Sequence, residues 1–189
     1  DLSQSRPDLY NKLKQRIQNW RDDVIDQKDS ICYLPVGYPE FPVTDLNAQD
    51  GLPSGDITWS SKHPNDSYFM NWHQIEDEMY WEIEVETSGY YEITLMYTCK
   101  QGDEGSEIEI EFKGNNVISR IKEPFDPPVK NERDRVERVE SYQKDFRSLE
   151  MGQLYLEKGK GRLYLKANSK TGETICDVRR IKVELVESK

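Results

Sequence analysis

Residues 81–97 read WEIEVETSGYYEITLMY, and this stretch decides the fold class. Apolar and acidic residues alternate over 81–86, Ser88-Gly89 supplies a turn signal, and the alternation resumes over 91–97. Alternation with a period of two is typical of strands that are buried on one face. The stretch therefore predicts two antiparallel strands that pair as a hairpin.

The same alternation recurs further along the chain, with no comparable helical period. Residues 107–112 read EIEIEF, and the turn-forming residues 114–116 follow them. The later apolar runs that complete the strands lie at 154–156, 163–165 and 181–185. Short strands between turn signals predict a mainly β fold, an antiparallel β-sandwich of jelly-roll type, rather than a βαβ arrangement.

Alternating glutamates accompany the apolar residues of these strands, at Glu82, Glu84, Glu86, Glu107, Glu109 and Glu111. A glycosidase needs two carboxyl groups that flank one bond. Alternation instead puts these side chains on the solvent face of a sheet, opposite the apolar face. We interpret them as a solvated acidic face, which also discourages edge pairing between chains.

The chain before residue 44 predicts an appendage to the sandwich. Pro7 and an acidic first turn open an amphipathic α-helix. Its apolar stripe consists of Leu9, Leu13, Ile17, Trp20 and Val24. A helix of this size is marginal alone in water, so the stripe is expected to pack on a partner. Prolines and a glycine then predict an extended connector. We expect the helix in 1–28, the connector in 29–43 and the β-sandwich in 44–189.

Composition limits the classes of partner. The 189 residues carry a net charge of -10, which makes duplex nucleic acid and anionic membranes poor partners. We expect no membrane insertion, because no run approaches the ~20 apolar residues that a spanning helix needs, and no signal segment opens the chain. Aromatic residues, 11 Tyr, 4 Trp and 5 Phe, are expected to supply much of the core.

The cysteines Cys32, Cys99 and Cys176 are widely spaced, and the chain has only two histidines. This pattern is unlike the ligand spacing of a zinc site. At most one disulfide can form among three cysteines, and buried free thiols are the simpler interpretation.

Short stretches along the chain resemble the C-terminal region of bacterial formylglycine-dependent sulfatases. The opening sequence DLSQSRPDL, with the helix through Trp20, resembles the closing helix of the sulfatase catalytic region. The remainder is similar to the accessory domain of polysaccharide-degrading members, a sandwich that resembles a carbohydrate-binding module. The stretches that carry this second similarity are 47–51, 64–72, 105–106, 126–128, 134–136, 140–146 and 177–179.

The resemblance implies a sulfatase as the parent protein, but no catalysis by this chain. The family's nucleophile motif is Cys or Ser followed by x-Pro-x-Arg, and it is absent here. Cys176 and Arg180 frame a similar segment, but Val178 stands where the proline belongs and a strand is predicted there. We therefore assign no catalytic residues. The resemblance also implies a periplasmic or extracellular location.

Aromatic residues in the polar segment 59–73 are candidates for sugar stacking. We predict a glycan site that includes Trp59, Asn65, Tyr68, Asn71 and Trp72. Rings of this kind stack on pyranose faces in sugar-binding sandwiches, while amides orient hydroxyls. The alternative is that the rings pin the segment to the core and the polar side chains cap its backbone.

The stretch 122–148 predicts a long loop, because three prolines precede a dense run of charges. Arg133, Arg135 and Arg138 are candidates for clamping the sulfate groups of a glycan. Acidic residues such as Asp134 alternate with them, so a charge network that orders the loop is the alternative.

Asp50 and Asp177 bracket the sandwich as calcium-binding acids do in the modules that it resembles. A structural calcium ion there would join the first and last strands, and no other cofactor is implied. Otherwise these are polar residues of a turn and a strand edge.

Two functions remain open. In the first, the chain is a non-catalytic accessory domain that binds polysaccharide, including sulfated glycan, and holds the enzyme on its substrate. In the second, it is a structural domain that packs on the upstream sulfatase catalytic domain or mediates oligomerisation.

Overall fold

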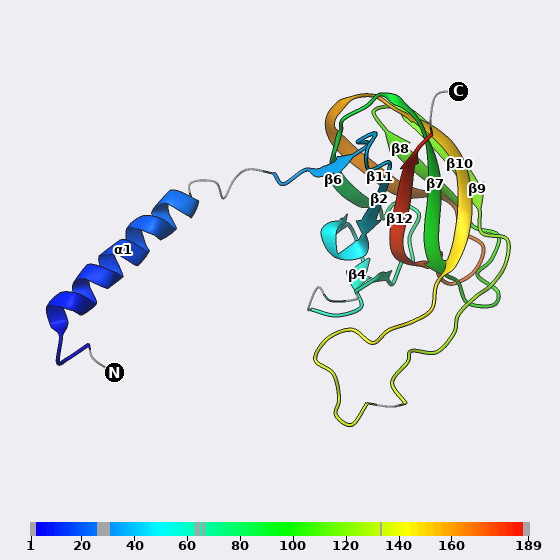
Figure 1. Ribbon diagram of the computed structural model, residues 1–189. Helices are drawn as coiled ribbons and strands as arrows, with labels where there is room; N and C mark the ends of the chain where they lie inside the picture. Colours follow the sequence, from blue (N-terminus) through cyan, green and yellow to red (C-terminus); the bar gives the residue numbers. More distant parts are fainter. Residues whose placement is uncertain (1–2, 26–30, 63–64, 66, 133, 187–189) are drawn as a thin grey trace. The chain divides into compact units, whose positions relative to one another are not determined.

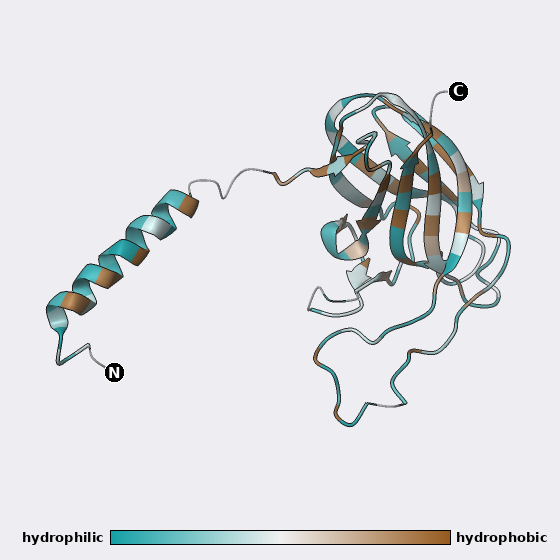
Figure 2. Ribbon diagram, viewed as in Figure 1, coloured by the Kyte–Doolittle hydropathy of each residue, from teal (hydrophilic) through white to brown (hydrophobic). Residues whose placement is uncertain are grey.

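The computed structural model describes residues 3–25, 31–62, 65, 67–132 and 134–186. The chain divides into two compact units, Asp1–Cys32 and Tyr33–Lys189. Among its described residues, the first unit contains one helix, α1 (Pro7–Ile25), with Asp8 in its first turn. The predicted stripe lies along this helix (Figure 2), and its five side chains are exposed. No membrane-spanning helix is found among the described residues.

The second unit is a β-sandwich of two six-stranded sheets, which confirms the predicted fold class (Figure 1). Sheet 1 has the order β1 (Leu34–Val36), β6 (Met79–Val85), β11 (Gly159–Ser169), β8 (Glu107–Phe112) and β9 (Asn115–Arg120), with β3 (Leu52–Pro53) on β6. Sheet 2 has the order β10 (Arg147–Leu156), β7 (Gly89–Thr98), β12 (Asp177–Leu185), β5 (Phe69–Met70) and β4 (Thr58–Trp59), with β2 (Val43–Asn47) on β12. A 3-10 turn, η1 (Ala48–Asp50), follows β2.

The strand pairs of both sheets are antiparallel, apart from β1 and β6, which run parallel. Through β1, part of the range assigned to the connector joins sheet 1, and the compact unit begins at Tyr33.

The predicted hairpin over 81–97 is wrong. Both of its strands exist, but β6 pairs with β1 and β11 in sheet 1, whereas β7 pairs with β10 and β12 in sheet 2. The chain crosses from one sheet to the other at residues 86–88. The apolar faces of β6 and β7 are therefore both turned into the core, each from its own sheet. Alternation alone does not distinguish this arrangement from a hairpin within one sheet, because both bury one face of each strand.

The sandwich core contains the large rings that composition led us to expect. Trp72, Trp81, Tyr91, Phe69 and Phe112 are fully buried. The indole nitrogens still find acceptors, because Trp81 Nε1 donates to the Asn47 carbonyl at 2.7 Å and Trp72 Nε1 donates to the Asp77 carbonyl at 3.0 Å. These bonds remove the cost of burying polar N–H groups.

The glutamates predicted to form an acidic face lie on the outer face of sheet 1, with Ile83, Val85, Ile108 and Ile110 turned inward. Basic side chains of β11 neutralise much of the face. Arg162 Nε lies 2.8 Å from Glu82, and Lys166 Nζ lies 3.1 Å from Glu111. The face is thus a set of cross-strand ion pairs rather than a purely acidic surface.

The long loop predicted at 122–148 runs between β9 and β10 and extends from one end of the sandwich (Figure 1). The strands reach further than predicted, so the loop covers 121–146. An isolated bridge from Phe125 to Cys99 ties its first part to the end of β7.

Candidate functional site

Two segments that are far apart in sequence form one surface at this end of the sandwich. The first consists of the described residues of 57–72 and the second of the described residues of the loop 121–146; together we call them the loop end. Ser60 Oγ lies 2.7 Å from Ser141 Oγ, and Asn65 Nδ2 donates to Glu140 Oε1 at 3.2 Å. These contacts place the predicted glycan residues and the charged loop beside each other.

A lysine with a largely buried side chain anchors the loop. Lys144 Nζ lies 2.6 Å from Asp126 and 3.1 Å from Asp177, and it sits over the Tyr68 ring at 5.6 Å from the centroid. Thr98 Oγ1 also donates to Asp177, at 3.0 Å. Burial lowers the pKa of Lys144, but the hydrogen bonds and charges of the two aspartates outweigh burial and raise that pKa above its usual 10.5. The ammonium group therefore stays charged and joins the loop to β12.

Three rings were predicted as stacking platforms, and the structure separates them. Trp72 is 1 % exposed and Tyr68 is 8 % exposed, so neither presents a face to a ligand. Trp59 is 38 % exposed. Its Nε1 donates to the Ala48 carbonyl at 2.9 Å, and its ring leans on Phe69 with centroids 5.8 Å apart. Trp59 is thus a ring held in one orientation and open to solvent on part of its surface.

The two predicted asparagines shape the backbone at the loop end. Asn71 has a φ of 65°, a left-handed conformation that is uncommon for residues other than glycine. Its Nδ2 donates to Thr58 Oγ1 at 2.9 Å, which fixes β4 beside β5. Asn65 bonds to Glu140 on the loop, as described above. The Asn71 amide thus supports the strand that carries Trp59, and the Asn65 amide joins its segment to the loop.

The arginines proposed as sulfate clamps differ in their surroundings. Arg133 lies outside the described residues. Arg135 is exposed. Arg138 Nε lies 2.6 Å from Asp134, and its guanidinium sits over the Tyr142 ring at 5.8 Å. The contacts of Arg138 fit the alternative interpretation, in which a charge network orders the loop.

The calcium-binding residues proposed from sequence have nearby protein partners. Asp177 contacts Lys144 and Thr98, and Asp50 accepts from Asn47 Nδ2 at 3.5 Å. Within the described part of the chain, no group of three or more His, Cys, Asp or Glu side chains is arranged to hold a metal ion. The calcium site stays a prediction.

The cysteines of the sandwich show no sign of activation. Cys99 and Cys176 are free and buried, whereas Cys32 is exposed. Burial raises the pKa of Cys99 to about 12 and raises that of Cys176 well above its usual value. A catalytic thiol needs the opposite shift, because the thiolate is the nucleophile.

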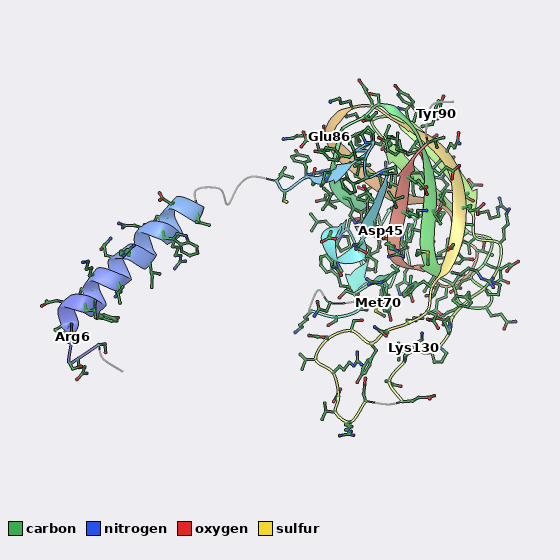
Figure 3. All side chains as sticks on the ribbon, viewed as in Figure 1. Arg6, Asp45, Met70, Glu86, Tyr90 and Lys130 are labelled. Carbon is green, nitrogen blue, oxygen red and sulfur yellow. The ribbon has the colours of Figure 1, made fainter. Side chains whose placement is uncertain are left out.

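A second surface, absent from the sequence predictions, lies at the opposite end of the sandwich. An open cleft of about 820 Å³ is lined there by Pro39 and Pro42, by the turn between β6 and β7, and by the outer face of β10, β7 and β12. Figure 3 shows Tyr90 at this end, away from Met70 and Lys130. We call the cleft, together with the adjoining Tyr155, the cleft end.

Two successive rows of side chains form the outer face here. In the first row Gln153 is the cross-strand partner of Glu92, and Glu92 is the partner of Glu184. In the second row Tyr155 is the partner of Tyr90. The sequence signal for this surface was an aromatic residue, Tyr90, at a solvent-facing position of the alternating strand 89–98.

Comparisons with known proteins bear on the fold. No family model matches the chain, and no curated protein matches it. Among solved structures, a GH26-CBM35 β-(1,4)-mannanase from Podospora anserina is similar, with a TM-score of 0.52 and 13 % identity, over 78 % of this chain and 28 % of the mannanase chain. The C-terminal CBM6 of LamC, a marine laminarinase from Zobellia galactanivorans, has a TM-score of 0.51 and 10 % identity, over 75 % of this chain and 98 % of that chain.

The Cry4Aa toxin of Bacillus thuringiensis is also similar, with a TM-score of 0.51 and 11 % identity, over 77 % of this chain and 24 % of the toxin chain. At such low identity these similarities establish the fold alone, a β-sandwich like that of carbohydrate-binding modules. The chain spans 28 % of the mannanase.

Proposed function

We propose that residues 33–189 form a non-catalytic module that binds polysaccharide at the loop end. The observation that carries this proposal is Trp59. Its hydrogen bond to Ala48 and its contact with Phe69 fix an exposed ring in advance of binding. Such preorganisation reduces the entropy cost of stacking on a sugar ring.

The surroundings of Trp59 and the fold support the same function. Thr58, which precedes Trp59 in β4, and the hydrogen-bonded pair of Asn65 and Glu140 provide hydroxyl, amide and carboxylate groups at the loop end. Such groups hydrogen-bond sugar hydroxyls. The mannanase and the laminarinase that share the fold carry domains whose names, CBM35 and CBM6, denote carbohydrate-binding modules.

The test is a titration of the chain against a panel of polysaccharides by isothermal calorimetry. Trp59→Ala is expected to weaken binding about tenfold, the loss typical of one stacked ring. Trp59→Phe retains an aromatic face and is expected to lose less. Binding that is unchanged in a folded Trp59→Ala protein would contradict a site at the loop end.

We propose further that the parent protein is a secreted sulfatase, located in the periplasm or outside the cell. The sequence resemblance carries this step, and the exposed Arg135 gives the loop end a guanidinium for sulfated glycan. Sequencing the gene around this chain tests the parentage. An upstream Cys-x-Pro-x-Arg or Ser-x-Pro-x-Arg motif supports it, and a gene without that motif contradicts it.

The structural alternative is favoured by a separate observation, the exposed stripe of α1. Five large apolar side chains along 19 residues leave the helix with a face that needs covering. The proposed partner is the sulfatase catalytic domain. In the parent protein, Trp20→Ala is then expected to lower the melting temperature, whereas Gln15→Ala, on another part of the helix surface, is expected to leave it unchanged.

A further inference from the structure

The outer face at the cleft end carries an aromatic pair that the core does not require. Tyr90 is 58 % exposed and Tyr155 is 39 % exposed. Their ring centroids are 5.4 Å apart and their planes meet at 71°, an edge-to-face arrangement. In this arrangement one ring steadies the other while a face stays open. The neighbouring Tyr91 faces inward and fills the core at this level. The exposed pair is therefore not needed for core packing and is available for a ligand.

A row of hydrogen-bonding groups lies one row away from the tyrosines. Gln153, Glu92 and Glu184 occupy adjacent positions across β10, β7 and β12, and all three line the cleft. Rows two residues apart along a strand are separated by about 7 Å. An apolar platform at that distance from amide and carboxylate groups matches a sugar chain, whose rings have apolar faces and hydroxyl edges.

The charge of the cleft decides which sugar chains fit. Glu92 and Glu184 are direct cross-strand partners, and Lys182 Nζ lies 2.5 Å from Glu184 Oε2. One lysine for two carboxylates leaves the row negative, in a chain whose net charge is -10. A polymer with sulfate or carboxylate groups is repelled by such a lining, whereas an uncharged one is not.

We propose that the cleft end is a second glycan-binding site, which accepts sugar chains without sulfate or carboxylate groups. Tyr90 provides the stacking face, Tyr155 supports it, and Gln153 and Glu92 bind hydroxyls. This goes beyond the proposed loop-end site, because it uses other residues at the opposite end of the sandwich. Either site can fail without the other.

The test uses the Trp59→Ala protein, which separates the two sites. The probes are dextran, laminarin and galactomannan as uncharged polymers, with dextran sulfate as the charged counterpart of dextran. At least one uncharged polymer is expected to bind this protein. Adding Tyr90→Ala is expected to weaken that binding about tenfold or more, the scale for one stacked ring. Tyr90→Phe keeps the ring and is expected to retain binding.

A charge variant tests the selectivity. Glu184→Gln changes a carboxylate that lines the cleft and has no assigned role in binding hydroxyls, so it is expected to leave binding of the uncharged polymer within about threefold. The same variant is expected to raise binding of dextran sulfate, because the repulsion is reduced. Thermal melts of each variant verify folding.

Three results would overturn the proposal. The first is that no uncharged polymer binds the Trp59→Ala protein, and the second is that binding survives in a folded Tyr90→Ala protein. The third is that dextran sulfate or cationic chitosan oligosaccharides bind at the cleft end in place of the uncharged polymers. Failure of the proposed loop-end site would give a different result: Trp59→Ala, made in the otherwise wild-type chain, would leave polysaccharide binding unchanged.

Discussion

The two ends of the sandwich use aromatic residues in opposite ways. At the loop end, Tyr68 and Trp72 are buried, and Lys144 and Phe146 of the long loop pack against the Tyr68 ring. At the cleft end, Tyr90 and Tyr155 stand on the open face of a regular sheet. Ring content therefore does not identify a binding surface. The position of each ring in the alternation of its strand, and what covers it, decides whether it stabilises the fold or meets a ligand.

The largest expected effect is on stability at the loop end. Trp72→Ala removes a fully buried indole and leaves the Asp77 carbonyl without its donor. The free energy of unfolding is expected to fall by about 3–5 kcal/mol. Urea titration of Trp72→Ala beside Trp59→Ala checks this, and the Trp59 variant is expected to lose only about 1–2 kcal/mol. Equal losses would mean that both rings belong to the core.

The second prediction concerns the buried thiols near the loop end. Cys99 and Cys176 are expected to react with iodoacetamide at pH 8 at least about a thousandfold more slowly than Cys32, because reaction requires local opening. The raised pKa of Cys99, about 12, reduces its thiolate fraction further. Peptide mass spectrometry over a time course measures the three rates.

In denaturant without reductant, all three thiols are expected to become reactive. If Cys99 and Cys176 stayed unreactive there, they would be joined as a disulfide and the prediction would be wrong. Comparable native rates for the three thiols would show that the loop end opens readily.

The third prediction is that the Lys144 cluster holds the loop in place. Lys144→Met leaves two carboxylates near each other and is expected to cost about 2 kcal/mol, since the lost ammonium group is nearly buried while Asp126 and Asp177 are partly exposed. Lys130→Met is the matched control on the same loop. Lys130 pairs with Asp145 at 2.5 Å, but its side chain is 56 % exposed against 9 % for Lys144. Its loss is expected to cost less than about 0.5 kcal/mol.

The pH dependence of that difference has a defined sign. The pKa of Lys144 is raised in the folded state, so its contribution is fully present below the usual value of 10.5 and is lost as pH rises through the folded-state pKa. The stability difference between wild type and Lys144→Met is expected to be constant from about pH 7 to 10 and to shrink above 10.5. A difference that already disappears by pH 9 would contradict the raised pKa.

The sequence predicted the strands well and their partners poorly. The alternation of 81–86 and 91–97 located β6 and β7, because burial of one face imposes a period of two. The same alternation would suit a hairpin or two strands in facing sheets. The distant partners β11 and β10 select the second arrangement, and no local pattern identifies them.

The candidate sites show the same limit. A polar segment rich in Trp and Tyr suggested a loop-end platform, and the structure leaves one ring of three exposed there. Tyr90 and Tyr155 were not predicted, because they lie 65 positions apart along the chain and only the pairing of β7 with β10 brings them together. Long-range pairing is the information that the sequence pattern lacked.

The smallest expected effect concerns the cleft end, where the sheet retains an unfavourable pair. Glu92 and Glu184 are cross-strand partners of like charge, and such pairs cost about 0.2–1 kcal/mol. Glu92→Gln is therefore expected to raise the free energy of unfolding by a few tenths of a kcal/mol, with the gain decreasing in 1 M salt because screening already weakens the repulsion. Glu150→Gln, on the neighbouring strand opposite Thr94, is the control without a facing carboxylate and is expected to change stability less. Urea titrations at low and high salt make the measurement. A loss of stability in Glu92→Gln would mean that the Glu92 carboxylate stabilises the sheet and that its pairing with Glu184 is not unfavourable.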